Sequence, residues 1–196
     1  MTEQDAGSVG IFGYGSLLTE PGPDIGPHIV ERVAQLSPWP IEYARSSRGR
    51  GGAPTLVLHP SGGFVTGEIL VLDVKIDQLD AVRAWLQVRE RTPAPSSIKV
   101  TALGGFRTVL YADLAANIPD AKRTADYLAD LAICSVAHVD EVSRNGIRYL
   151  ADNVKRQIVT PLTDPYIDAV LRKTGARDLR QAEQMLVDAR CARELK

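Results

Sequence analysis

The spacing of apolar and polar positions changes near residue 120 of this chain. Before that point, short apolar or alternating stretches are separated by segments rich in glycine and proline. Such stretches are typical of β-strands, and they predict strands at 9–13, 29–36, 41–44, 55–58, 64–72, 98–103 and 106–112. For 29–36 a helix is the alternative. One helical stripe, at 75–89, interrupts the strands because its apolar residues recur every three or four positions.

From residue 121 onward the period is helical almost to the end. It predicts helices at 121–138, 145–158, 164–174 and 178–193, with Pro161 and Gly175 as breaks between them. Two turns look like hairpin connections: Gly104-Gly105, and the segment 60–63 between the strands at 55–58 and 64–72. Because strands precede helices instead of alternating with them, we expect an α+β fold and not a parallel α/β sheet.

Composition limits the classes of function. The 196 residues are 44% hydrophobic and 24% charged, as in a globular protein with a real core. The net charge of −1 gives no general attraction to nucleic acid or to anionic lipid, so we expect neither partner. Residues 1–7 look like a polar tail and not a signal peptide, and the two cysteines form no redox or zinc motif. A cytoplasmic protein without a metal is predicted.

The strand at 9–13 leads directly into the loop Gly13-Tyr14-Gly15-Ser16-Leu17. Glycine accepts positive φ and lets a ligand approach the backbone, so several N–H groups could face one anion. A dinucleotide-binding loop is excluded, because Leu18 replaces its third glycine and Pro21 stands where a helix should continue. Ser16 lacks the flanking glycines of a nucleophile elbow, so we interpret it as a hydrogen-bonding group.

Glu90 closes the helical stripe at 75–89, and Pro93 then turns the chain away. If this helix end packs against the glycine loop, a partly buried carboxyl would suit acid–base chemistry. The alternative is an exposed partner of its neighbouring arginines. A loop earlier in the chain could bind a carboxylate or phosphate, or could be ordinary solvated surface; its arginines are Arg45, Arg48 and Arg50.

Three blocks, in order, carry a resemblance to a known family. They are 9–17, with Tyr-Gly-Ser-Leu; 85–90, with an aromatic and leucine before Arg-Glu; and 143–150, with Asn-x-x-x-Tyr-Leu. Together they resemble the γ-glutamylcyclotransferase superfamily, most closely its ChaC-like, glutathione-specific branch. The resemblance implies a mixed, partly closed β-barrel with flanking helices. It divides the chain into a tail (1–7), a catalytic region (8–157) and a C-terminal helical extension (158–196).

The resemblance also implies the reaction: the α-amine of a γ-glutamyl amide attacks its own γ-carbonyl and releases 5-oxoproline, a cyclising lyase reaction without a cofactor. Glu90 would be the catalytic acid–base. The residues implied in substrate binding are Gly13, Tyr14, Gly15, Ser16, Leu17, Arg48 and Tyr149. The family usually has Gly-Gly-Tyr soon after its glutamate, whereas this chain has Thr-Pro-Ala-Pro-Ser-Ser at 92–97, which affects one wall of the pocket.

Three hypotheses therefore stay open. The substrate is glutathione; or it is a γ-glutamyl amino acid, γ-glutamylamine or γ-glutamyl-protected natural product; or the chain is a non-catalytic module that binds a small carboxylate. The sequence does not distinguish a monomer from a homodimer.

Overall fold

The computed structural model describes residues 8–194, so the predicted tail at 1–7 lies outside the described residues. The strands are β1 (Val9–Gly13), β2 (Ile29–Leu36), β3 (Ile41–Ser47), β4 (Ala53–Leu58), β5 (Thr66–Leu72), β6 (Ile98–Leu103) and β7 (Phe106–Ala112). The helices are α1 (Ser16–Thr19), α2 (Leu79–Glu90), α3 (Ala125–His138), α4 (Gly146–Lys155), α5 (Thr163–Thr174) and α6 (Leu179–Glu194). The α+β class is confirmed, and every predicted strand and helix is present within a few residues of its expected bounds.

The described residues form two compact units, each assembled from separated segments. The sheet unit contains 8–37 and 66–114, and the helical unit contains 38–65 and 115–194. The division at residue 157 that the resemblance implies follows sequence blocks instead, and it stays a prediction.

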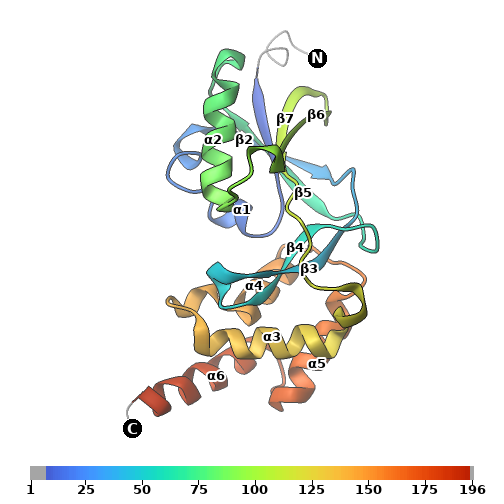
Figure 1. Ribbon diagram of the computed structural model, residues 1–196, viewed down its shortest axis with the longest axis vertical. Helices are drawn as coiled ribbons and strands as arrows, with labels where there is room; N and C mark the ends of the chain where they lie inside the picture. The colour runs from blue at the N-terminus through green and yellow to red at the C-terminus, as the bar shows by residue number, and fades with distance from the viewer. Residues whose placement is uncertain (1–7, 195–196) are drawn as a thin grey trace. The chain divides into compact units, whose positions relative to one another are not determined.

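The sheet unit is built on a five-stranded mixed sheet in the order β2-β5-β1-β7-β6 (Figure 1). β1 lies at its centre, antiparallel to β5 and parallel to β7, and all five of its residues are buried. This is why its sequence is apolar without alternation. The sheet is open, and not the partly closed barrel that the resemblance implies, because β3 and β4 pair with each other in a separate sheet.

One predicted hairpin is confirmed and the other is wrong. β6 and β7 pair across Gly104-Gly105 as expected. β4 does not pair with β5, because the turn between them folds back on β3: the N–H of Ile41 donates to the Gly63 carbonyl (2.8 Å) and the N–H of Gly63 donates to that of Ile41 (3.2 Å). A Cβ at Gly62 would lie 2.2 Å from the Ile41 carbonyl oxygen, so glycine is required for this contact.

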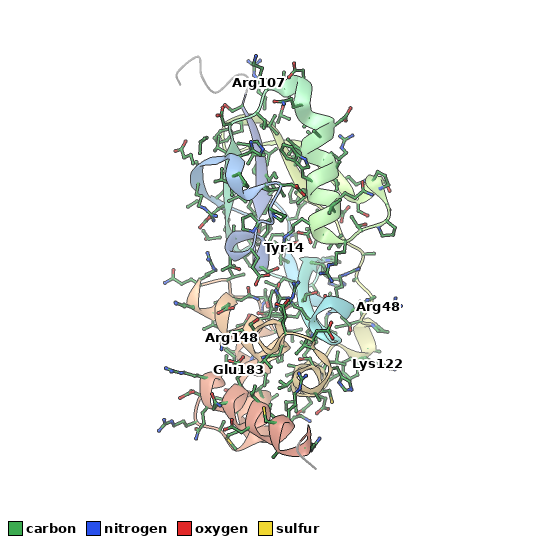
Figure 2. The ribbon with its side chains drawn as sticks, turned by 90° about the vertical axis from the view of Figure 1, so that its left-hand side faces the viewer. Tyr14, Arg48, Arg107, Lys122, Arg148 and Glu183 are labelled. Atoms are coloured by element: carbon green, nitrogen blue, oxygen red, sulfur yellow. The ribbon has the colours of Figure 1, made fainter. Side chains whose placement is uncertain are left out.

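The helical unit combines the β3–β4 ribbon with α3, α4, α5 and α6 (Figure 1). Its core contains two fully buried tyrosines, Tyr43 and Tyr166, whose rings meet edge to face with centroids 5.3 Å apart. α6 is fixed to the start of α4 by the buried carboxylate of Glu183, which accepts hydrogen bonds from Asn145 and Arg148 (Figure 2). Within residues 8–194 no helix is both long and apolar enough to cross a membrane.

Candidate functional site

The glycine loop follows β1, the central strand of the sheet unit, and Tyr14 lies where that strand ends (Figure 2). Gly15 has φ 61° and ψ −133°, a conformation that a residue with a Cβ rarely adopts. A Cβ at Gly13 would lie 3.0 Å from the side chain of Leu17, so a larger residue there would require that side chain to shift. The ring of Tyr14 packs near that of Phe12, with centroids 6.0 Å apart.

A single helical turn, α1, follows the loop at once, although no helix was expected there. The N–H of Leu18 donates to the Gly15 carbonyl (3.2 Å), and that of Glu20 donates to the Ser16 carbonyl (2.8 Å). Pro21 then stops the helix, because proline cannot donate the next hydrogen bond. The expectation was therefore wrong about the turn itself and right that no long helix continues from the loop.

Helix α2 packs on the sheet unit with its buried residues Val82 and Leu86 and brings Glu90 to its last position. Trp85 stacks on the ring of His28, with centroids 4.9 Å apart and planes 6° from parallel. The helix ends at Arg91, which has the left-handed conformation (φ 51°). The Arg91 and Thr92 N–H groups donate to carbonyls of the last turn, the pattern of a Schellman cap.

Arg89 connects this helix end to the glycine loop. One nitrogen of its guanidinium group donates to the Glu90 carboxylate (Nη1 to Oε1, 2.6 Å), and another donates to the Ser16 hydroxyl (Nη2 to Oγ, 3.1 Å). Nε and Nη2 also donate to the Glu20 carbonyl, at 3.1 and 3.0 Å. The side chains of Arg89 and Glu90 are each 15% exposed. The end of α2 and the loop thus share one hydrogen-bonded cluster, which we call the Arg89 cluster (Ser16, Glu20, Arg89, Glu90).

The loop is held from a second direction by Arg32 of β2. Its guanidinium donates to the Leu18 carbonyl (3.0 Å) and to the Glu68 carboxylate on β5 (2.9 Å). Two arginines from different elements therefore fix the backbone of 16–20. Sequence reasoning assigned no role to either one, although Arg89 belongs to the Arg-Glu pair of the resemblance.

The other predicted site residues, Arg48 and Tyr149, belong to the helical unit, and their roles stay predictions. Arg48 is exposed on the 3₁₀ turn Arg48–Arg50. Tyr149 is buried on α4, where its hydroxyl oxygen accepts from the N–H of Leu56 (3.3 Å). The guanidinium carbon of Arg50 lies 4.5 Å from the centre of the Tyr149 ring, a cation–π contact.

Arg50 corrects one part of the sequence interpretation. A solvated surface was one of the two alternatives for the loop arginines, but Arg50 is only 7% exposed. It also donates to the Arg144 carbonyl (3.4 Å). The sequence signal was weak because the contact partners lie about a hundred positions further along the chain.

Besides Glu183, the helical unit holds the buried carboxylate of Glu42 on β3, which sequence reasoning did not single out. Its oxygens accept hydrogen bonds from the Thr160 hydroxyl (2.6 Å) and from the N–H groups of Tyr43 (2.8 Å) and Leu162 (3.3 Å). Burial raises the pKa of Glu42, while these hydrogen bonds act in the opposite direction. Because its hydrogen bonds join β3 to the segment before α5, Glu42 fastens the fold.

Comparison with known proteins supports the resemblance at the level of the fold. No family model matches the sequence, and no curated protein matches it. Solved structures do match. A glutathione-specific γ-glutamyl cyclotransferase from yeast has a TM-score of 0.52 at 16% identity over 85% of this chain and 99% of the other. Its selenomethionine-labelled form gives 0.50 at 15% identity, over 85% and 96%. The fold of this chain is similar to that of the yeast cyclotransferase.

At this low identity the similarity shows the fold alone, so the chemistry must be argued from the residues of the site. Within residues 8–194, no three His, Cys, Asp or Glu side chains are grouped so that they could hold a metal ion. The Arg89 cluster is the place in the sheet unit where a carboxylate, a hydroxyl and a glycine loop meet.

Proposed function

We propose that this protein is a γ-glutamylcyclotransferase that acts on glutathione or a related γ-glutamyl amide. The observation that carries the proposal is the Arg89 cluster, which joins Glu90 to the loop of residues 13–17. The similarity of fold to the yeast enzyme agrees with the proposal.

Both reacting groups belong to the substrate, so the protein mainly has to fold one molecule into an attacking conformation. Intramolecular reactions in a favourable geometry reach effective molarities of about 10⁵ M or more. The attack forms a bond between the α-nitrogen and the γ-carbonyl carbon, closing a five-membered ring. The bond from that carbon to the leaving nitrogen then breaks, giving 5-oxoproline and a free amine.

Glu90 would move the proton that this reaction requires. The α-amine is an ammonium group at neutral pH and attacks only after it loses a proton, which the carboxylate accepts. The same proton then goes to the departing nitrogen, and the second proton that the ring nitrogen loses follows by the same route. The amine therefore leaves as an ammonium group and the enzyme returns to its starting state. General acid–base catalysis of this kind contributes roughly 10²- to 10⁴-fold to a rate.

The loop would bind the negative charge of the substrate. Backbone N–H groups at residues 14–17 suit the α-carboxylate or the oxyanion of the tetrahedral intermediate, and the Ser16 hydroxyl adds a further hydrogen-bonding group. Arg48 and Tyr149 are proposed, from the resemblance alone, to contact the glutamyl part. We also propose that the reaction runs in the cytoplasm without a cofactor.

A second candidate is a cyclotransferase with a different γ-glutamyl substrate. In place of the family's Gly-Gly-Tyr, Pro93 and Pro95 follow Glu90, and a 3₁₀ turn forms at Pro95–Ser97. Such a segment would present a stiffer wall with a different shape to the amine side of the substrate.

A panel of γ-glutamyl compounds tests both candidates. The purified protein is incubated with glutathione, γ-glutamyl amino acids and γ-glutamylamines, and 5-oxoproline is measured by mass spectrometry. Release from glutathione supports the first candidate, and release from another member supports the second. If no member yields 5-oxoproline while ligands still bind, the protein is a non-catalytic carboxylate-binding module and the proposal is wrong.

A further inference from the structure

All three nitrogens of the Arg89 guanidinium group are engaged within the sheet unit. Nη1 donates to the Glu90 carboxylate, Nη2 donates to the Ser16 hydroxyl, and Nε and Nη2 both donate to the Glu20 carbonyl. A planar group with several donors in fixed directions can make these contacts together, whereas a lysine ammonium is a single charged point. The local geometry therefore depends on arginine and not only on positive charge.

The stem of Arg89 lies beside Gly22, where a Cβ would be 3.4 Å from Cγ of Arg89, an ordinary van der Waals distance. With both side chains 15% exposed, the ion pair between Arg89 and Glu90 is largely shielded from water. Shielded pairs with good geometry hold their orientation better than surface pairs, which water and salt weaken.

The two carboxylate oxygens of Glu90 differ in their surroundings. Oε1 accepts the short hydrogen bond from Arg89 (2.6 Å). Oε2 has no hydrogen-bond partner anywhere in the range 8–194 that the structure covers. A carboxylate fastened by one oxygen has a fixed direction for the other, which is what a proton acceptor requires.

We propose that Arg89 is the positioning residue of the reaction: it fixes the Glu90 carboxylate relative to the glycine loop, so that Oε2 faces the substrate amine. This inference rests on the proposed function. Arg89 itself does not touch the reacting atoms. Its removal should therefore slow the chemical step more than it weakens substrate binding.

The test compares Arg89→Lys and Arg89→Ala with Arg91→Lys, the matched exchange on the exposed residue at the other side of Glu90. We expect Arg89→Lys to lower kcat roughly 10- to 100-fold, since small misplacements of a catalytic group have effects of this size. KM should change less than about threefold if substrate binding is independent of this geometry. Arg91→Lys should behave as the wild type.

Chemical rescue separates positioning from a merely structural role. Guanidinium ion, added far below its denaturing range, should restore part of the kcat of Arg89→Ala, with the same concentration of sodium chloride as control. Rescue supports a local role, and a loss of kcat that guanidinium leaves unchanged overturns it. Thermal unfolding of each variant identifies any that fails to fold, and Arg89→Lys then decides the question.

The outcomes distinguish this inference from the proposed function. A wild type that releases no 5-oxoproline from any γ-glutamyl compound overturns the proposed function. An active wild type with an equally active Arg89→Ala overturns only the role of Arg89. A variant that raises KM while kcat is unchanged also overturns it, because the residue would then act on binding.

Discussion

Two carboxylates of this protein, the partly buried Glu90 in the sheet unit and the fully buried Glu42 in the helical unit, are held in opposite ways. Glu90 ends a helix, is paired with an arginine and has one oxygen without a hydrogen bond among residues 8–194. Glu42 lies in a strand and is completely buried, and both of its oxygens accept from neutral donors. Glu90 thus has one oxygen that no hydrogen bond among residues 8–194 engages, whereas both oxygens of Glu42 hold parts of the fold together.

This difference teaches how to separate a functional carboxylate from a structural one when both are largely shielded from water. Burial alone does not decide, because both groups are shielded from water. The hydrogen-bonding capacity that the fold leaves unused is the better criterion, since a catalytic carboxylate must still accept a proton from its substrate. By this criterion Glu90, and not Glu42, is the group to test for catalysis.

The sharpest test is to remove the charge at each position. Glu90→Gln should lower the rate of 5-oxoproline release by roughly 10²- to 10⁴-fold, because an amide cannot accept and return the proton. The fold should be retained, as judged by circular dichroism and the midpoint of thermal unfolding. Glu42→Gln is the matched control and should keep most of the activity. Undiminished turnover by Glu90→Gln would remove this residue from the mechanism.

Replacing each glutamate by alanine should affect stability in the opposite order to activity, with the larger loss of stability at Glu42. Glu42→Ala removes the acceptor of three hydrogen bonds and creates a cavity, so the free energy of unfolding should fall by about 3 kcal/mol. Glu90→Ala should cost about 1 kcal/mol or less, because its partner Arg89 keeps other acceptors. Urea unfolding measures both values. Equal losses would contradict the distinction between the two groups.

The pH dependence of stability sharpens the comparison further. Since burial raises the pKa of Glu42, the folded protein keeps this proton to a higher pH than the unfolded chain does. The contribution of Glu42 to stability is therefore largest at acidic pH and falls as pH rises from about 4 through the folded pKa.

The measurement is the unfolding free energy of the wild type minus that of Glu42→Gln, from about pH 4 to pH 8. The difference should decrease with rising pH and then level off. Thr160→Val removes a hydrogen bond that lowers this pKa, so it should move the decrease to higher pH. A difference that grows with pH would show that the hydrogen bonds outweigh burial.

The smallest effect is expected where α2 ends. Arg91 has a left-handed conformation that costs a residue with a Cβ about 1 kcal/mol. Arg91→Gly should therefore raise the unfolding free energy by a few tenths to about 1 kcal/mol, after the greater flexibility of glycine in the unfolded chain is subtracted. Activity should not change. A loss of stability would mean that the arginine side chain contributes more than its conformation costs.

The sequence predicted those features that depend on local pattern. β6 and β7 match their expected bounds, since alternation and a Gly-Gly turn are both local signals. The β4–β5 hairpin was wrong because a turn sequence does not say which strand its residues will contact, and here they contact Ile41. Helix α1 was missed because one helical turn is too short to show a period.

The site was predictable only in part, for the same reason. The loop and Glu90 were found by motif, but the bridge between them spans more than seventy positions and leaves no periodic signal. The burial of Arg50 depends on Tyr149, about a hundred residues later. Contacts of this kind follow from tertiary packing, which single-sequence patterns do not encode.

The position of β1 has a consequence for biosynthesis. The central strand leaves the ribosome before its neighbours, because its antiparallel neighbour β5 begins at residue 66 and its parallel neighbour β7 at residue 106. Until synthesis has passed about residue 110, the nascent chain thus carries an apolar strand with an open hydrogen-bonding edge, the feature that promotes aggregation. Translation that stalls in this interval should give insoluble fragments, whereas the completed polypeptide covers both edges of β1.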